Sequence, residues 1–306
     1  MGKIAIVFSG QGAQYSGMGK SLFECSDAAK NLYAFAEKFR PGTQKQSFEG
    51  TAEELKETKN TQPCLYLVDL CAALALKEKG INADGVAGFS LGEIAALAYS
   101  GVYSAETGFE IVCQRGEFMQ KAASEHDTAM AAVLKIDSKA VEDLCEGIEN
   151  LYPVNYNSPL QTVVAGAKQS IEELKSKAKD AGARVLDLPV SAAFHSPYMS
   201  SAAESFAEFL QGFEMNAPQM PIYANYTATP YGDDVLPILT KQMNNPVKWT
   251  QTINAMIEDG YTDFIEAGAG KTLCGLIKKI SPDVRVYSVE DEETLNATVE
   301  AVKANA

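Results

Sequence analysis

The chain has 306 residues, of which 46% are hydrophobic and 22% are charged. This length and composition are typical of a globular α/β protein with one large domain or two smaller ones. The 26 basic and 40 acidic residues give a net charge of −14, which argues against nucleic acid or an anionic membrane as a partner.

Further classes are excluded by what the sequence lacks. No apolar run approaches the roughly 20 residues of a membrane span, and the first residues lack the pattern of a signal peptide. The 6 cysteines form no Cys-x-x-Cys pair and the chain has only 2 histidines, so we expect no metal site. We therefore expect reduced thiols and a cytoplasmic protein.

The first expected element is a strand at residues 4–8, a continuous apolar run typical of a parallel strand buried on both faces. Residues 9–14 then read Ser-Gly-Gln-Gly-Ala-Gln. They are not a dinucleotide-binding fingerprint, because its third glycine would fall at Tyr15. We expect these glycines to let the backbone approach a ligand at the carboxyl end of the strand.

Helices are expected at roughly 20–39 and 52–58. A third, long helix is expected to begin around Pro63, since proline is favoured in the first turn, and to end before Gly80. This alternation of strands and helices predicts a mostly parallel sheet.

The most informative segment is Gly-x-Ser-x-Gly at residues 88–92, which has the form of a nucleophile elbow between a strand and a helix. Residues 91–99 predict the helix. At such a turn the Ser90 hydroxyl projects from the top of the sheet, and the amide of Leu91 points to where an oxyanion would form. The alternative is an ordinary glycine-rich turn, because so short a pattern also occurs by chance.

A second informative residue lies on the helix expected at 105–122. Arg115 falls in the middle of the apolar stripe of this helix. An unpaired buried guanidinium is costly, so Arg115 requires a partner. The functional interpretation is a two-pronged clamp for a substrate carboxylate, and the alternatives are a snorkelling arginine or a structural ion pair.

The pattern changes at residues 127–189 to a strand, a helix, two strands, a helix and a strand. This βαββαβ order is ferredoxin-like and predicts a subdomain inserted into a larger one formed by residues 1–126 and 190–306. His195 follows the insert in an irregular loop of small residues. We expect it to face Ser90 across a cleft, and we expect the other histidine to be solvated.

A series of short segments carries a further pattern in chain order. They are Gly10-Gln11-Gly12-Ala13-Gln14, Thr61-Gln62-Pro63, Gly88-Phe89-Ser90-Leu91-Gly92-Glu93, Gln114-Arg115-Gly116, Asn155-Tyr156-Asn157-Ser158-Pro159, Phe194-His195-Ser196, Asn245-Pro246-Val247-Lys248-Trp249 and Glu266-Ala267-Gly268. Each segment is moderately specific. All of them in register resemble the malonyl-CoA:acyl carrier protein transacylase family over the length of the chain.

The resemblance implies an α/β-hydrolase-like large subdomain with a mostly parallel sheet, together with the ferredoxin-like insert. It also implies an acyltransferase of fatty acid biosynthesis that moves malonyl from malonyl-CoA to the phosphopantetheine thiol of acyl carrier protein without a cofactor. Ser90 would form the acyl-enzyme and His195 would be its base. The backbone amides of Gln11 and Leu91 would form the oxyanion hole, and Arg115 would bind the malonyl carboxylate. Further residues expected at the substrate pocket are Gln62, Asn157, Phe194 and Lys248.

Some positions depart from the family pattern. Phe89 stands where the family usually has histidine, so the resemblance does not define the wall of the acyl pocket there. Lys248 replaces a usual glutamine or arginine, a change that is tolerable if only its backbone carbonyl is used. The resemblance implies that a backbone carbonyl near residues 245–249 orients the histidine, and Asp187 is an alternative.

Other functions use the same residues. A serine thioesterase or hydrolase needs the same dyad, an acyltransferase of polyketide synthesis would serve another carrier, and a non-catalytic protein could keep the fold. We expect a monomer that binds the acidic carrier through a local basic patch. Candidate cations for that patch are Lys168, Lys175, Arg184, Lys248, Lys271, Lys278 and Lys279.

Overall fold

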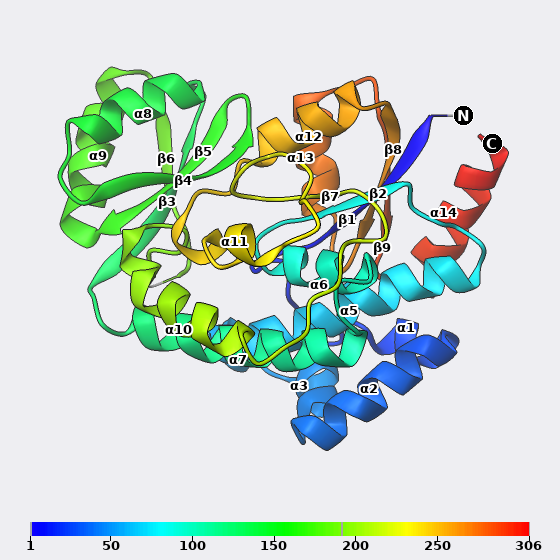
Figure 1. The fold of residues 1–306 in the computed structure, drawn as a ribbon. Helices are drawn as coiled ribbons and strands as arrows, with labels where there is room; N and C mark the ends of the chain where they lie inside the picture. Colours follow the sequence, from blue (N-terminus) through cyan, green and yellow to red (C-terminus); the bar gives the residue numbers. More distant parts are fainter. Residues whose placement is uncertain (1, 191, 306) are drawn as a thin grey trace.

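Two sheets organise the chain in the computed structural model, which describes residues 2–190 and 192–305 (Figure 1). The larger sheet is 5-stranded, with the order β7-β2-β1-β8-β9 and parallel pairing throughout. Its strands are β1 (Lys3–Phe8), β2 (Gly85–Gly88), β7 (Ile222–Tyr223), β8 (Tyr261–Ala267) and β9 (Arg285–Val289).

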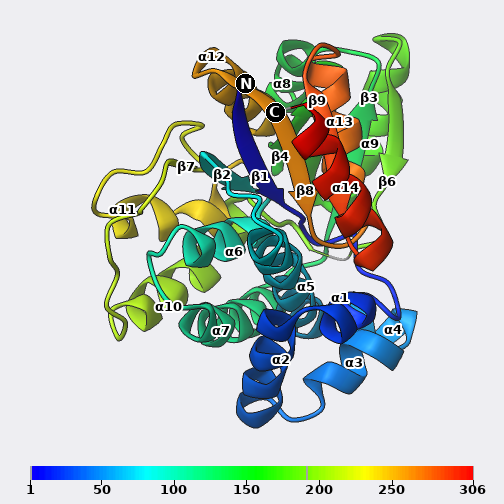
Figure 2. The same cartoon turned by 90° about the vertical axis from the view of Figure 1, so that its right-hand side faces the viewer.

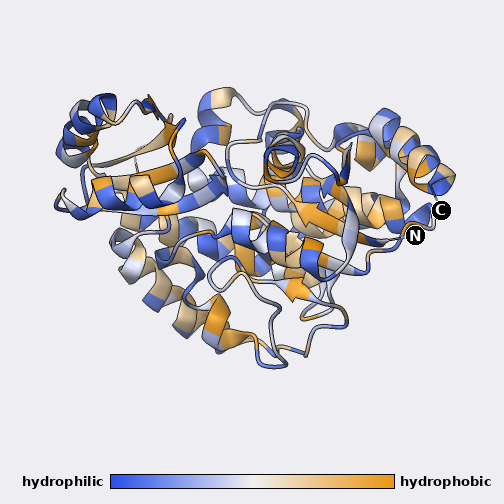
Figure 3. Ribbon diagram, turned by 90° about the horizontal axis from the view of Figure 1, so that it is seen from above, coloured by the Kyte–Doolittle hydropathy of each residue, from blue (hydrophilic) through white to orange (hydrophobic). Residues whose placement is uncertain are grey.

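Helices cover both faces of this parallel sheet. Ile6 and Phe8 of β1 pack with the core around α5 (Thr58–Glu78) and α6 (Leu91–Tyr99). Ala5 and Val7 pack on the opposite face, with α12 (Trp249–Glu258) and α13 (Thr272–Ile280). Figure 2 shows the two helical layers on either side of the strands, and Figure 3 shows hydrophobic residues concentrated on the central strands. Burial on both faces explains the continuous apolar run of β1.

The large subdomain contains further helices around these two layers. They are α1 (Lys20–Cys25), α2 (Asp27–Phe39), α3 (Thr43–Glu49), α4 (Ala52–Lys56), α7 (Ala105–Ala123), α10 (Ser200–Leu210), α11 (Leu236–Leu239) and α14 (Glu292–Ala304), with 3-10 turns η1 (Pro197–Met199) and η2 (Gln242–Asn244).

Two expected helices differ from the structure. The helix expected at 20–39 is two helices, because Ser26 is extended and its side chain accepts the N–H of Ala29 as the N-cap of α2. The long helix begins at Thr58, because the Thr61 N–H already bonds back to the carbonyl of Glu57 at 2.8 Å. Pro63 therefore lies inside α5 and does not open it.

The second sheet belongs to the inserted segment. It has the order β4-β5-β3-β6 with antiparallel pairing, and two helices cover one face. The elements in chain order are β3 (Thr128–Leu134), α8 (Ser138–Glu146), β4 (Leu151–Ser158), β5 (Gln161–Ala167), α9 (Lys168–Asp180) and β6 (Arg184–Asp187). The expected α/β class, with a mostly parallel sheet and a βαββαβ insert, is confirmed.

Strand β4 ties the insert to the large subdomain. The Tyr156 N–H donates to the carbonyl of Val247 at 2.9 Å, and the Val247 N–H donates to the carbonyl of Val154 at 2.8 Å. Val247 lies between η2 and α12. Asn155 of β4 lines one cavity with Gly10 and Phe89, so the insert lies beside the carboxyl ends of β1 and β2.

In the described ranges, none of the helices has the length and apolar character needed to cross a membrane. The same ranges hold no group of three or more His, Cys, Asp or Glu side chains arranged to bind a metal ion.

Candidate active site

Ser90 lies in a sharp turn between β2 and α6. Its backbone has φ 53° and ψ −102°, a conformation that L-residues rarely adopt. A Cβ at Gly88 would lie 2.0 Å from the carbonyl carbon of Gly92, so only glycine fits there. The Ser90 N–H donates to Oδ1 of Asn225 at 2.7 Å. The local sequence and this bond hold the serine side chain toward the cleft.

His195 meets Ser90 from the loop that follows the insert. Its Nε2 lies 2.7 Å from the Ser90 Oγ. Its Nδ1 lies 3.0 Å from the carbonyl of Gln242 and 3.2 Å from that of Asn245. Because carbonyl oxygens only accept, Nδ1 carries the proton and Nε2 is the acceptor for the serine hydroxyl. Asp187 lies elsewhere, in a 2.8 Å ion pair with Lys175.

The surroundings of His195 keep its ring neutral. Burial and then the positive charge of Arg115 lower the pKa of His195 from 6.5 to about 4, and the two carbonyls oppose this shift. A neutral imidazole with a free Nε2 is the form that can remove a proton from Ser90.

Arg115 reaches the same hydroxyl from α7. Its Nη2 lies 3.3 Å from the Ser90 Oγ, and the whole side chain is 0% exposed. Nη1 donates to Gln62 Oε1 at 2.8 Å and Nη2 donates to Gln242 Oε1 at 2.7 Å. Among the described residues, Nε has no hydrogen-bond partner. The guanidinium is thus held by two neutral amides, and its Nε–H is unused in the described part of the chain.

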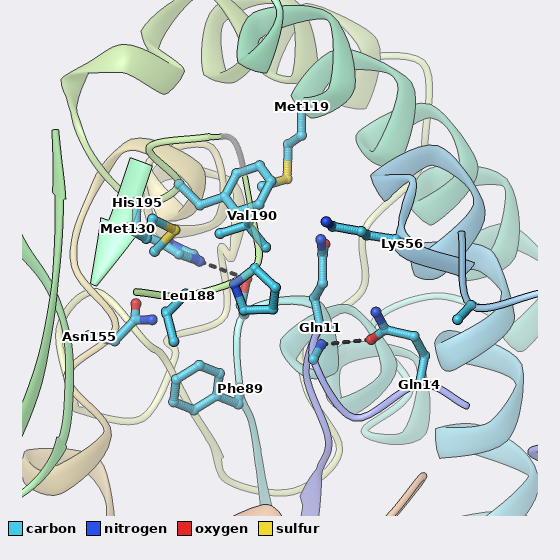
Figure 4. A pocket seen from close by; sticks show the side chains of 15 residues that line it. Gln11, Gln14, Lys56, Phe89, Met119, Met130, Asn155, Leu188, Val190 and His195 are labelled. Carbon is cyan, nitrogen blue, oxygen red and sulfur yellow. Dashed lines mark hydrogen bonds between the residues drawn. The ribbon is translucent and has the colours of Figure 1, made fainter. Parts of the chain in front are cut away.

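A cavity of about 350 Å³ opens at Ser90 and His195 (Figure 4). In Figure 4, Gln11, Gln14 and Lys56 lie on one side and Phe89, Leu188 and Asn155 on the other. The lining residues are Gln11, Gly12, Gln14, Ala52, Lys56, Phe89, Ser90, Met119, Met130, Asn155, Leu188, Pro189, Val190, Phe194 and His195.

The remaining expected site residues take different places. Phe194 lines this cavity, and Asn157 lines a neighbouring cavity of about 230 Å³ that shares Gln11 and Phe89 with it. Gln62 is buried behind the wall, against Arg115. Lys248 lines neither cavity, and its Nζ lies 5.6 Å from the centre of the Tyr226 ring.

The two residues predicted to supply backbone amides to an oxyanion hole follow neighbouring strands of the parallel sheet. Gln11 follows β1 and Leu91 follows β2, and Phe8 at the end of β1 pairs with Gly88. Within the described ranges no hydrogen bond occupies the N–H of Gln11 or Leu91. These free donors beside Ser90 form an arrangement suited to a developing oxyanion.

Comparison with known proteins fits this geometry. The acyl transferase domain family matches residues 5–289. The malonyl CoA-acyl carrier protein transacylase of Bacillus subtilis (strain 168) is 38% identical over 311 residues, covering 99% of this chain and 98% of the relative. The chain belongs to this transacylase family. The Haemophilus influenzae member is 35% identical over 315 residues, covering 98% of this chain and 99% of the relative.

Solved structures of the transacylase family have the same fold. The Clostridium perfringens enzyme superposes with a TM-score of 0.95 at 33% identity, covering 99% of this chain and 98% of that one. A malonyl-transacylase in complex with its type II PKS acyl-carrier protein superposes with a TM-score of 0.93 at 32% identity, covering 98% of this chain and 99% of that one.

Sequence reasoning missed four residues of the site. Asn225 holds the backbone at Ser90, Gln242 contacts Arg115, Glu93 contacts Gln242, and Lys56 is the lysine that lines the cavity. Glu93 stands in the family's elbow motif, but no signal in the sequence pairs it with Gln242, 149 positions away.

The cations expected at a docking patch are partly engaged with other groups. Lys168 pairs with Asp127, and Lys175 with Glu172 and Asp187. Lys278 donates to backbone carbonyls. Lys56, by contrast, lines two cavities at the active-site mouth.

Proposed function

We propose that the chain transfers malonyl from malonyl-CoA to the phosphopantetheine thiol of acyl carrier protein through an acyl-enzyme on Ser90, supplying fatty acid biosynthesis. Acyl carrier protein is its partner, and the substrate is a coenzyme A thioester. The observation that carries the proposal is one serine hydroxyl held 2.7 Å from a neutral histidine and 3.3 Å from a buried arginine. The pair of Ser90 and His195 is suited to acyl transfer, and the arginine is suited to binding an acyl group that carries a carboxylate.

The first half-reaction follows from the hydrogen bonds at Ser90. Nε2 of His195 takes the hydroxyl proton as the serine oxygen attacks the thioester carbonyl. The N–H groups of Gln11 and Leu91 stabilise the oxyanion. The carbon–sulfur bond then breaks, and the imidazolium gives its proton to the coenzyme A thiolate.

The second half-reaction reverses these steps with another thiol. His195 deprotonates the phosphopantetheine thiol of the carrier, whose sulfur attacks the malonyl ester of Ser90. When the tetrahedral intermediate collapses, the carbon–oxygen bond breaks and the proton returns to the Ser90 hydroxyl. The carbonyls of Gln242 and Asn245 accept the Nδ1–H throughout and stabilise the transient imidazolium.

Malonyl recognition is assigned to one edge of the Arg115 guanidinium. Nε and Nη2 form that edge, and their parallel N–H groups match the two oxygens of a carboxylate. Nε has no hydrogen-bond partner in the part of the chain that the structure describes, and the Nη2 contact with Ser90 is long, at 3.3 Å. Displacing that contact releases the serine hydroxyl for attack. An acetyl group has no carboxylate and leaves the guanidinium unpaired.

The phosphopantetheine arm, which coenzyme A and holo-acyl carrier protein share, is assigned to the insert side of the cleft. Asn155 and Asn157 of β4 both line the cavity of about 230 Å³ beside the catalytic one. The Oδ1 atoms of both are buried without a hydrogen-bond partner among the described residues. The arm carries two amide N–H groups, which fit two unpartnered carbonyl oxygens.

A carrier of polyketide synthesis is the second candidate partner, because one similar structure holds a type II PKS acyl-carrier protein. We infer a cytoplasmic monomer. Six free cysteines support a reducing compartment. The exposed large hydrophobic side chains Tyr15, Phe39, Leu160 and Leu186 are spread over separate elements, which supports a single copy.

The test is the intact mass of the protein after brief exposure to malonyl-CoA, for wild type and Ser90→Ala. We expect one malonyl adduct on the wild type alone, discharged by holo-acyl carrier protein. Release of malonate and coenzyme A without carrier would instead indicate a hydrolase, and an adduct on Ser90→Ala would reject the nucleophile.

A further inference from the structure

A buried acid behind Arg115 has no part in the steps above. Glu93 lies in the first turn of α6, and its side chain is 0% exposed. Its Oε1 accepts the N–H of Asn225 at 3.1 Å and the hydroxyl of Tyr231 at 2.6 Å. Its Oε2 accepts Nε2 of Gln242 at 2.7 Å. All three partners donate a hydrogen bond to the carboxyl group, and such an environment suits an ionised carboxylate.

Gln242 joins this carboxylate to the arginine. Its Nε2 donates to Glu93 Oε2 and, at 2.6 Å, to the carbonyl of Ser90. Its Oε1 accepts Nη2 of Arg115 at 2.7 Å. A carboxylate only accepts, so it requires the amide nitrogen of Gln242 on its own side. The amide oxygen is thereby turned toward Arg115.

The amide also separates two opposite charges. Among the residues that the structure describes, no carboxylate forms an ion pair with Arg115. Burial lowers the pKa of Arg115 to about 10, and the charge of Glu93 opposes that shift. Glu93 thus stabilises the cation across one neutral side chain. A direct ion pair would occupy the donors that a substrate carboxylate needs.

We propose that Glu93 is a positioning residue for malonyl recognition, which through Gln242 holds Arg115 in place and balances its charge without occupying Nε, the donor reserved for the substrate carboxylate. This inference rests on the proposed Arg115 clamp. It assigns to Glu93 a role in selecting the acyl group, and it assigns to Gln242 the role of a neutral spacer.

Glu93→Gln tests the proposal with almost no change in side-chain size. The new amide must put a donor either against Gln242 or against Asn225 and Tyr231, so the chain of hydrogen bonds to Arg115 breaks at one point. At pH 8 Glu93 is mostly ionised, since burial raises its pKa to about 7. We expect the ratio of kcat/KM for malonyl-CoA to that for acetyl-CoA to fall at least about tenfold, mainly through the KM of malonyl-CoA.

Gln242→Met is the second variant, because it removes both the donor to Glu93 and the acceptor for Arg115 with little change in side-chain length. Loss of these two contacts is expected to lower the same ratio even where Glu93→Gln fails to fold. Asp263→Asn is the matched control: this buried acid pairs with Arg285 near the start of β8, away from the cleft. We expect it to lower the melting temperature and leave the ratio unchanged.

The outcomes separate this inference from the proposed function. An unchanged ratio in folded Glu93→Gln and Gln242→Met overturns the inference, as does an equal loss with both substrates. If Arg115→Ala also leaves the ratio unchanged, the clamp itself is wrong. If Arg115→Ala lowers the ratio and the other two variants do not, the clamp stands and only the role of Glu93 is rejected.

Discussion

The two sides of the cavity are built on different principles. On the side of the large subdomain, Ser90, His195 and Arg115 are fixed by hydrogen bonds in several directions. On the insert side, Met130 and Leu188 present apolar surface, and Asn155 has an amide oxygen without a partner among the described residues. The first side has the geometry that bond making requires, and the second has surface and unused acceptors for holding a substrate. Substitutions on the large-subdomain side should therefore mainly lower the rate, and substitutions on the insert side should mainly weaken substrate binding.

The largest expected effect is that of His195→Ala on the large-subdomain side. Loss of the general base should slow malonyl adduct formation roughly 10²–10⁴-fold, measured by rapid-quench mass spectrometry. Met130→Ala, on the insert side of the same cavity, is the control and should keep the rate within about tenfold. Equal losses in the two variants would remove the distinction between the sides.

Arg115→Ala should change selectivity more than folding. A two-pronged charged contact accounts for about a hundredfold preference, so malonyl transfer should be lost and acetyl transfer should rise relative to it. Competition between the two coenzyme A thioesters measures this directly. A variant that keeps the wild-type preference would show that the carboxylate binds elsewhere.

The charge of Arg115 should also affect how the reactivity of Ser90 depends on pH. Activity needs neutral His195, whose pKa is lowered to about 4, so the reaction of Ser90 with a neutral fluorophosphonate should persist at pH 5 and fall only as the pH drops through about 4. In Arg115→Met one cause of that lowering is removed, so the acid limb should move up toward 6.5. The profiles are compared below pH 6, where Glu93 is protonated in both proteins. A limb at the same pH in both would argue against this coupling.

The smallest expected effect lies on the insert side. Asn155→Ala and Asn157→Ala should each raise the KM of malonyl-CoA by up to about tenfold with little change in kcat, since each removes one acceptor for the arm. The control substrate is the malonyl thioester of ethanethiol, which has neither amide of the arm. Rates with this substrate should not respond, and an equal loss with both would indicate a general disturbance of β4.

The sequence predicts the features that local chemistry dictates. The elbow at Ser90, the buried β1 and the βαββαβ insert follow from glycine spacing, apolar runs and element order. The pairing of His195 with Ser90 was expected from its loop and from family resemblance. The roles of Ser90, His195, Gln11, Leu91 and Arg115, and the insert boundaries at 127 and 189, stay predictions.

Other features depend on tertiary contacts that no local pattern encodes. Gln242 lies in a short 3-10 turn, and its neighbours Glu93 and Arg115 are 149 and 127 positions away in the chain. The division of the helix at Ser26 needs only one extended residue, which hydrophobic periodicity does not reveal. Pro63 was assigned to the start of a helix because proline fits there, but the turn at Glu57 starts α5 earlier.

The backbone at the proposed nucleophile and the proposed base has a consequence for the evolution of the protein. Ser90 has φ 53° and His195 has φ 61°, and neither is glycine. Residues held in such conformations cost about 1–3 kcal/mol each, within a total stability of about 5–15 kcal/mol for a typical protein. Many stabilising substitutions at these two positions would therefore be inactivating ones. The catalytic centre depends on a stability reserve kept by the rest of the fold, so mutations remote from the cleft can limit which active-site changes the chain tolerates.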